Sequence, residues 1–332
     1  MPAQARRPRL GELFSREEIR QLTQRSDAMG AWAVGSTWAV IGLSFAVLAY
    51  ANSHFPFWAL VPTFLLVLLI IAGRQLALAI LQHDAAHGTL FKSAWGNDVL
   101  TDWLCARPIW NELHKYRPYH LVHHARTSSE QDPDLSLTAN FPTTRRSLAR
   151  KLLRDLSGAS GLKFLLGRLL MDAEVLKWTV ANDVQRLPAA GRRWPDHLRA
   201  FLKNSAGMFI ANAVLFGLLW ASGQAWLYGV WVLAYVTPFP LLVRIRSMAE
   251  HACTETSPDT LRNTRTTAAG FLARATVAPL RVNFHIEHHL MASVPYFRLP
   301  QLHRMLRDRN LTSQPPSYLE VLRIVSGRSL QS

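Results

Sequence analysis

The sequence predicts an all-α integral membrane protein, in which four transmembrane helices carry a cytosolic helical cap with a di-metal histidine site. The first observation is the pooling of apolar residues, because residues 31–73 and 204–243 contain no Lys, Arg, Asp or Glu. Each block is long enough for two helices of about 20 residues, the length that crosses a hydrocarbon core. The second observation is a set of three histidine clusters, all of which lie outside these blocks.

Short polar turns divide each block into two spans. The first block is interrupted at residues 51–56, which end in a proline, and the second at residues 222–224. The predicted spans therefore lie near residues 31–50, 57–82, 206–222 and 225–243. We expect the second helix to continue past the bilayer into the cap, because leucine and isoleucine recur beyond its first charged residue, Arg74.

The distribution of charge predicts which side of the membrane the loops occupy. The formal net charge is +15, from 37 Lys and Arg against 22 Asp and Glu, and every basic residue lies outside the two uncharged blocks. Basic segments beside membrane helices are typical of the cytoplasmic face, so we expect both termini and the large loops there. No zinc-finger, RRM or helix-turn-helix pattern accompanies the charge, which therefore does not indicate a nucleic-acid partner.

Residues 1–30 carry charges throughout and are predicted to be a cytosolic N-terminal segment rather than a cleavable signal. Residues 31–305 form the predicted membrane domain, and residues 306–332 a cytosolic C-terminal tail. The abundance of Ala, Arg and Leu is typical of a GC-rich bacterium, which favours an inner-membrane location.

Two amphipathic helices are predicted in the loop between the second and third spans. Leucines recur at helical spacing over residues 148–156 and 162–170, beside basic residues. Basic amphipathic helices of this kind lie in the membrane interface. A face that packs against other parts of a soluble domain is the alternative.

The histidine clusters predict a metal site. Spacings of three and four residues place side chains on one face of a helix. Imidazoles held this close repel one another when protonated, so the pattern indicates neutral donors to a metal. The candidate ligands are His83 and His87 in the first cluster, His120, His123 and His124 in the second, and His285, His288 and His289 in the third.

Eight imidazoles exceed the needs of one ion and therefore predict two. Imidazole suits Zn, Cu, Fe and Ni, although a closed structural zinc site normally takes four ligands and fits poorly. The two cysteines are too few for an iron–sulfur cluster. The first cluster follows the second span, the second cluster lies in the long loop, and the third cluster follows the fourth span. All three are therefore predicted on the same side of the membrane and can converge.

Residues beside the clusters supply further expectations. Pro118 suits the first turn of a helix that carries the second cluster, and Pro279 and Pro295 bracket the third. Isolated histidines are usually ordinary structural residues, and we interpret His54, His197 and His303 in that way. His114 is a weaker candidate for a functional role.

The three clusters, HDAAH, HLVHH and HIEHH, resemble the signature of the membrane fatty-acid desaturase superfamily, which also contains hydroxylases and alkane- or carotenoid-oxidising enzymes. The flanking residues are similar as well: His-His-Ala-Arg-Thr with Asp132-Pro133-Asp134 downstream, Asn283-Phe284 before the third cluster, and Val294-Pro295-Tyr296-Phe297 after it. The resemblance covers about residues 35–305.

The resemblance implies two iron ions in the cap near the membrane and an acyl tunnel that leads to them. It also implies a ninth ligand, which His251 matches in position. Some members carry Asn four residues before that histidine, where it holds a metal-bound water, whereas this chain has Ser247. The cluster spacing is closer to that of acyl-lipid-type or bacterial members than to that of the animal acyl-CoA enzymes.

The functional hypothesis is an O₂-dependent di-iron oxidoreductase that introduces a double bond into a fatty acyl chain. Asp84, Glu287, Asp132 and Asp134 are expected to accept hydrogen bonds from imidazole N–H groups, with a solvent-facing role as the alternative for Asp84 and Glu287. Electrons would come from a separate ferredoxin or cytochrome, docked on the basic cytoplasmic face. A fatty-acyl hydroxylase or an alkene-forming fatty-acid decarboxylase is the alternative on the same scaffold. A histidine-rich membrane transporter or metal-binding protein would require ionisable groups inside the spans, and apart from Arg74 near the edge of the second span these spans have none.

Overall fold

The computed structural model describes residues 8–189 and 191–327, and within those ranges the chain forms helices and no β-strand. The all-α prediction is therefore confirmed for this part of the chain. Residues 1–7 of the predicted N-terminal segment and residues 328–332 of the predicted tail lie outside it. The boundaries proposed at residues 30 and 305 remain predictions.

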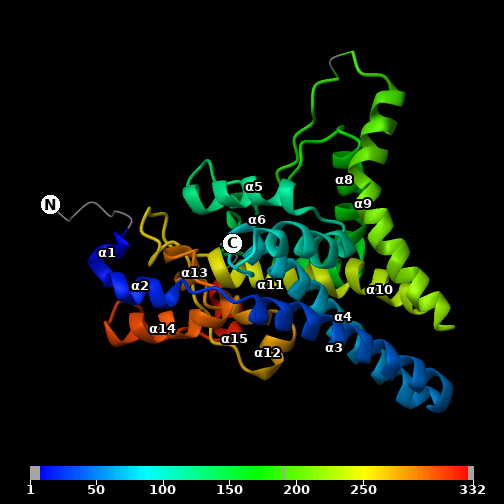
Figure 1. Ribbon diagram of the computed structural model, residues 1–332, viewed down its shortest axis with the longest axis horizontal. Coiled ribbons are helices and arrows are strands. Elements are labelled where there is room, and N and C mark those ends of the chain that lie inside the picture. The colour runs from blue at the N-terminus through cyan, green and yellow to red at the C-terminus, as the bar shows by residue number, and fades with distance from the viewer. Residues whose placement is uncertain (1–7, 190, 328–332) are drawn as a thin grey trace.

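Four candidate membrane spans are present, as predicted. The first candidate runs Arg16–His54 and contains α3, and the second is α4. Helices α3 and α4 pack along each other and project together from the rest of the molecule (Figure 1). The third is α9, and the fourth is formed by two consecutive helices, α10 and α11. Their bounds are α3 Asp27–His54, α4 Phe57–Ala86, α9 Trp194–Ala221, α10 Leu227–Val236 and α11 Pro238–His251.

The remaining helices are short. The α-helices among them are α1 Leu10–Leu13, α2 Arg16–Leu22, α5 Leu113–Arg126, α6 Leu135–Thr138, α7 Arg145–Leu156, α8 Ala159–Asp172, α12 Phe271–Ala275, α13 His285–Leu290, α14 Leu299–Asp308 and α15 Tyr318–Val325. Two π-helices, η1 Gly96–Leu100 and η2 Asp102–Ala106, and three 3₁₀-helices, η3 Arg107–Ile109, η4 Pro279–Arg281 and η5 Tyr296–Arg298, complete the described chain.

Helix α4 is the centre of the fold. It packs against α3, α5, α10 and α11. Its first half exposes large apolar side chains, among them Phe57, Trp58 and Leu65, whereas residues 75–78 and 80–86 are buried. The apolar exposed half suits a lipid environment, and the buried half carries the first histidine cluster into the interior, as expected of a helix that continues past the bilayer.

Two spans differ from their predicted bounds. Helix α9 begins at Trp194 rather than near residue 206, because Pro195 occupies its first turn and Asp196 accepts a hydrogen bond from the backbone N–H of Arg193 at 2.9 Å. The fourth span is broken at Thr237, since Pro238 disfavours helical geometry in the residue before it and lacks an N–H of its own. Helix α11 continues after the break and ends at His251, beside the histidine clusters.

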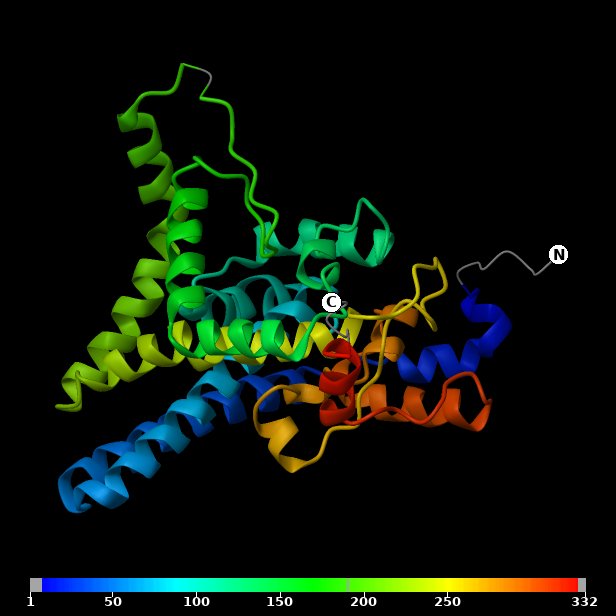
Figure 2. The ribbon, with the colours of Figure 1, turned by 180° about the vertical axis from the view of Figure 1, so that it is seen from behind.

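The two predicted amphipathic helices form as α7 and α8, which Figure 2 shows from behind. Their apolar faces are divided between two environments. Leu148 is buried and Leu152 packs beside it against α11 and α15. Leu153, Leu162 and Leu166 remain 58–65% exposed. Some leucines of α7 and α8 thus serve internal packing, and the others are free to contact a membrane surface.

The close approach of α8 to the broken span yields a stability prediction. A Cβ at Gly161 would lie 2.2 Å from the carbonyl oxygen of Val236, whereas a Cβ at Gly167 on the same helix would meet nothing within 4 Å. We expect Gly161→Ala to destabilise the protein by about 1–3 kcal/mol through overpacking. Gly167→Ala is the matched control and should be neutral or slightly stabilising, because alanine favours a helix by about 1 kcal/mol. Thermal unfolding in detergent measures both, and equal melting temperatures for the two variants would contradict the prediction.

Candidate metal centre

Nine histidines from four helices gather at one place in the interior. The first pair lies at the C-terminal end of α4, the second cluster on α5, His251 at the end of α11, and the third cluster on α13. All nine are buried except His87 and His251, which are half-buried. The convergence predicted from the order of spans and clusters is therefore present.

The histidines form two adjoining groups. In group one, the ligand atoms lie within 4.8 Å of one another; its members are His83, His87, His120, His124 and His288. Group two contains His123, His251 and His289. A further donor set, His285 with Glu250, shares His251 with group two, and we count His285 in group two on that ground. The rings of His124 and His289 stack at a centroid distance of 4.1 Å, so the groups are in direct contact.

Several imidazole nitrogens face each other at the spacing of neighbouring ligands on one ion. In group one, the Nε2 atoms of His120 and His288 lie 3.1 and 3.0 Å from the Nε2 of His124. In group two, the Nε2 atoms of His285 and His251 are 2.8 Å apart. Two nitrogens bound at right angles, each about 2.1 Å from an ion, would be about 3 Å apart. The geometry therefore fits metal coordination in both groups.

Buried nitrogens without partners support the same conclusion. The Nε2 atoms of His83 and His87 are shielded from solvent and have no hydrogen-bond partner among the described residues. A buried polar atom left in this state costs free energy, which coordination to a cation would recover. The donor set, composed of neutral imidazole, suits a divalent transition metal.

Carboxylates fix the orientation of two of the rings. The Nδ1–H of His83 donates to Asp84 at 2.9 Å, and that of His123 donates to Asp132 at 2.7 Å. Asp132 is itself held by the backbone N–H groups of Ser128 and Asp134, each at 2.9 Å. Such contacts select the tautomer that leaves Nε2 available as a ligand. Asp84 and Asp132 thus lie where the sequence analysis expected them.

Electrostatics keeps most of the site neutral. Burial lowers the pKa of His120, His124, His285 and His288 well below its usual value, and neighbouring imidazoles lower it further. Burial acts in the same direction on His123. There, however, the hydrogen bond to Asp132 and the charges of Asp134 and Glu250 outweigh it, and the pKa is raised. Neutral rings are the form that binds metal.

His303 has a partner at the site that the sequence analysis missed. We interpreted it as an ordinary structural residue, but its Nδ1 lies 2.6 Å from Oε1 of Glu287, inside the third cluster. The other oxygen of Glu287 accepts from Thr266 at 2.5 Å. Glu287 therefore binds a histidine outside the two groups, rather than a ligand candidate, and ties α13 to α14. In the sequence, His303 is a single histidine one helical turn after Leu299, and such a position does not by itself indicate a contact with the site.

A buried ion pair, Arg246 with Glu250, lies beside group two. The guanidinium of Arg246 donates to Glu250 at 2.7 Å, and the same carboxylate oxygen lies 3.6 Å from Nδ1 of His285. Nothing in the spacing of the histidine clusters pointed to Glu250, because it meets His285 only through the packing of α11 against the third cluster.

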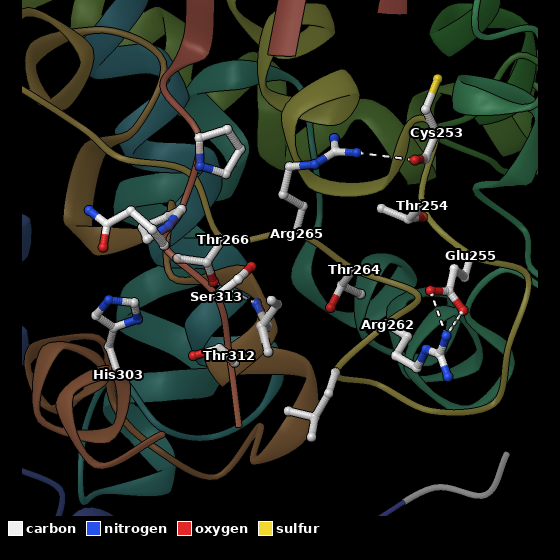
Figure 3. Close-up of a pocket in the computed structure, with 15 residues that line it drawn as sticks. Cys253, Thr254, Glu255, Arg262, Thr264, Arg265, Thr266, His303, Thr312 and Ser313 are labelled. Carbon is white, nitrogen blue, oxygen red and sulfur yellow. Dashed lines mark hydrogen bonds and ion pairs between the residues drawn. The ribbon is translucent and has the colours of Figure 1, made fainter. Parts of the chain in front are cut away.

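A cavity of about 280 Å³ lies beside the third cluster, lined in part by Thr266, Ile286 and His303 (Figure 3). None of the nine histidines is among the described residues that line it. Its arginines are already engaged, since Arg262 pairs with Glu255 and Arg265 donates to the carbonyl of Cys253. The cavity is therefore a neighbour of the centre and not the centre itself.

Other expectations need correction. Pro118 lies inside α5 and not in its first turn; the helix begins five residues earlier, at Leu113. Arg74, the first charged residue of the second helix, donates to the carbonyl of Ala275 at 2.8 Å. His114, His54 and His197 lie outside both groups, and their contacts are with Glu112, the carbonyl of Tyr50 and the carbonyl of Ala173, respectively.

The fold and the site together define a class: an all-helical membrane protein with four candidate spans and two adjoining histidine groups that could each hold a metal ion. The chain belongs to the fatty acid desaturase family, whose model matches residues 56–320. It is also similar to dihydrorhizobitoxine desaturase from Bradyrhizobium elkanii, with 26% identity over 93% of this chain and 82% of that protein. The resemblance seen in the sequence is thereby confirmed.

The contact between Asp132 and His123 predicts a change in metal affinity. Replacing Asp132 with Ala removes the acceptor that fixes the ring, so we expect metal affinity to fall about 10- to 100-fold. Metal retained during titration with a chelator measures the change. Asp308→Ala, at an exposed position far along α14, is the control and should retain metal like the unaltered chain. Equal retention by both variants would rule out the orienting role.

Proposed function

We propose that this chain is an O₂-dependent membrane oxidoreductase that uses two iron ions to introduce a double bond into a fatty acyl chain. The observation that carries the proposal is the division of nine histidines into two adjoining groups, each with the geometry for one ion. Family membership supports the chemistry, because the chain belongs to the fatty acid desaturases. The related protein's name, which specifies a desaturase, favours desaturation over hydroxylation or decarboxylation.

The proposed ligands are the members of the two groups. His83, His87, His120, His124 and His288 would hold one ion, and His123, His251, His285 and His289 the other. When bound, the iron pair supplies the redox chemistry that activates dioxygen for removal of hydrogen from an unactivated methylene. Iron in particular is inferred from the family, since imidazole also suits other metals.

The chain's own residues position and protect this centre. Asp84 and Asp132 hold protons on Nδ1 of His83 and His123, which directs the opposite nitrogens inward. Burial of the rings excludes water, which would otherwise compete for the metal and quench reactive species. The contact of Glu287 with His303 ties α13 to α14 and so limits movement of the third cluster.

The proposal includes an orientation and a redox partner. We propose that both termini and the histidine groups face the cytoplasm of a bacterial inner membrane, because the basic residues lie outside the spans. Electrons would come from a separate ferredoxin or cytochrome. The net charge of +15 suits an acidic partner at that face.

The named substrate of the relative supports a second candidate. That protein is a desaturase of dihydrorhizobitoxine, and it aligns with 93% of this chain. The same scaffold could therefore accept this compound in place of an acyl chain. Parallel assays with both substrates distinguish the two candidates.

Metal analysis provides the first test. We expect purified protein to contain two iron ions per chain, and His124→Ala and His285→Ala, one from each group, to lose iron. His114→Ala, an exposed histidine outside both groups, should retain the full content. Zinc in place of iron, or unchanged iron in the two group variants, would contradict the assignment.

Product analysis provides the second test. We expect reconstituted protein, supplied with a reduced ferredoxin or cytochrome and O₂, to convert an acyl lipid to a product that lacks two hydrogens. Omission of the electron donor should abolish turnover. A product that gains an oxygen atom would identify a hydroxylase, and loss of the carboxyl carbon a decarboxylase. Turnover without any donor would count against the redox partner.

A further inference from the structure

A second cavity, of about 190 Å³, lies at one end of the first span, and none of the nine histidines is among the described residues that line it. Its wall combines the start of α3, including Trp32, with two arginines from the segment between α11 and the third cluster, Arg274 and Arg281. Tyr296 closes one side. No Asp or Glu is among the described residues that line it, so its charge is uncompensated.

Neither arginine side chain is engaged elsewhere in the described part of the chain. Arg246, Arg244 and Arg107, in contrast, all pair with carboxylates. Arg274 is exposed and Arg281 is half-buried, and neither donates through its guanidinium to a described residue. Two free guanidinium groups in one cavity repel each other, and an anion between them would remove that repulsion.

Three features place the cavity at a membrane boundary. Trp32 is 68% exposed at the beginning of the uncharged block of α3, a position at which tryptophan favours the lipid interface. Arg74 is the first charged residue after the apolar part of the antiparallel helix α4. Helix α12, at the lower edge of the molecule in Figure 1, exposes Phe271 by 90% and Leu272 by 69%, as expected of a segment that inserts into lipid.

Helix α4 contacts the end of α12 closely. A Cβ at Gly73 would lie 2.4 Å from the carbonyl oxygen of Ala275, so only glycine permits so close an approach. The next residue, Arg74, donates to the carbonyls of Ala275 at 2.8 Å and Arg274 at 3.3 Å. The position of Arg274 relative to the spans is therefore fixed by α4.

The backbone beyond α12 is also held in an uncommon form. Leu280 and Arg281 have φ values of 52° and 64°, which non-glycine residues rarely adopt. Such conformations cost free energy and persist where the surrounding structure requires them, often at ligand sites. The turn places Arg281 on the wall of the cavity, four residues before His285.

We propose that this cavity binds the anionic phosphate head group of a membrane lipid. Guanidinium groups match phosphate oxygens with paired, charge-assisted hydrogen bonds. The surrounding apolar residues, Trp32, Ala278 and Leu280, suit the adjoining glycerol and acyl region. The inference does not depend on the proposed oxidation chemistry, because lipid binding is measured without turnover.

Native mass spectrometry of the full chain in detergent tests this inference. The unaltered protein should retain phosphatidylglycerol in preference to phosphatidylcholine. The pair Arg274→Gln and Arg281→Gln should lower phosphatidylglycerol retention about tenfold or more. The pair Arg274→Lys and Arg281→Lys keeps the charge and should retain more lipid than the glutamine pair.

The matched control removes the same charge elsewhere. Arg304 and Arg323 are exposed on α14 and α15 and do not line the cavity, so Arg304→Gln with Arg323→Gln should leave retention unchanged. Equal loss in the control pair, no loss in the cavity pair, or equal retention of phosphatidylcholine would overturn the proposal. Full displacement of lipid by inorganic phosphate would identify a free-phosphate site instead. Melting temperatures confirm that each variant is folded.

Discussion

The desolvation of nine closely packed imidazoles is the constraint on which the rest of this structure depends. Rings that touch at centroid distances near 4 to 5 Å cannot all be protonated, and several of their nitrogens are hidden from water without a protein partner. Such an arrangement is unfavourable unless a cation satisfies the nitrogens. The fold must therefore hold four separate helix ends rigidly around one buried volume, and it must keep water out of it.

Helix α4 meets that requirement because its first half is exposed and apolar and its second half is buried in the interior. Its first half displays apolar side chains outward, and its second half is buried and ends in His83 and His87. Helix α11 reaches the same place from the fourth span, because it follows α10 after the break at Thr237 and ends at His251. The candidate membrane spans thus supply two of the four supports for the site, and their packing determines how far apart the candidate metal ligands can lie.

Carboxylates outside the two groups stabilise the site in different ways. Asp84 and Asp132 accept hydrogen bonds from Nδ1–H of His83 and His123 and fix which nitrogen faces inward. Glu287 lies within the third cluster but binds His303, so it anchors the helix rather than a ligand candidate. Membership of a histidine cluster in sequence therefore does not establish a common role. The direction in which each side chain leaves its helix decides it.

The sequence by itself determined the spans, the eight clustered histidines and their meeting on one side, because charge-free length and helical spacing are local properties. His251 was recognised only through family resemblance. Tertiary structure alone decided how the candidate ligands are grouped. On α5, His120 and His124 join group one while His123 turns to group two; on α13, His285 and His289 join group two while His288 turns to group one. Residues one position apart diverge by about 100° around a helix, so which group each ring joins depends on where the neighbouring helices lie.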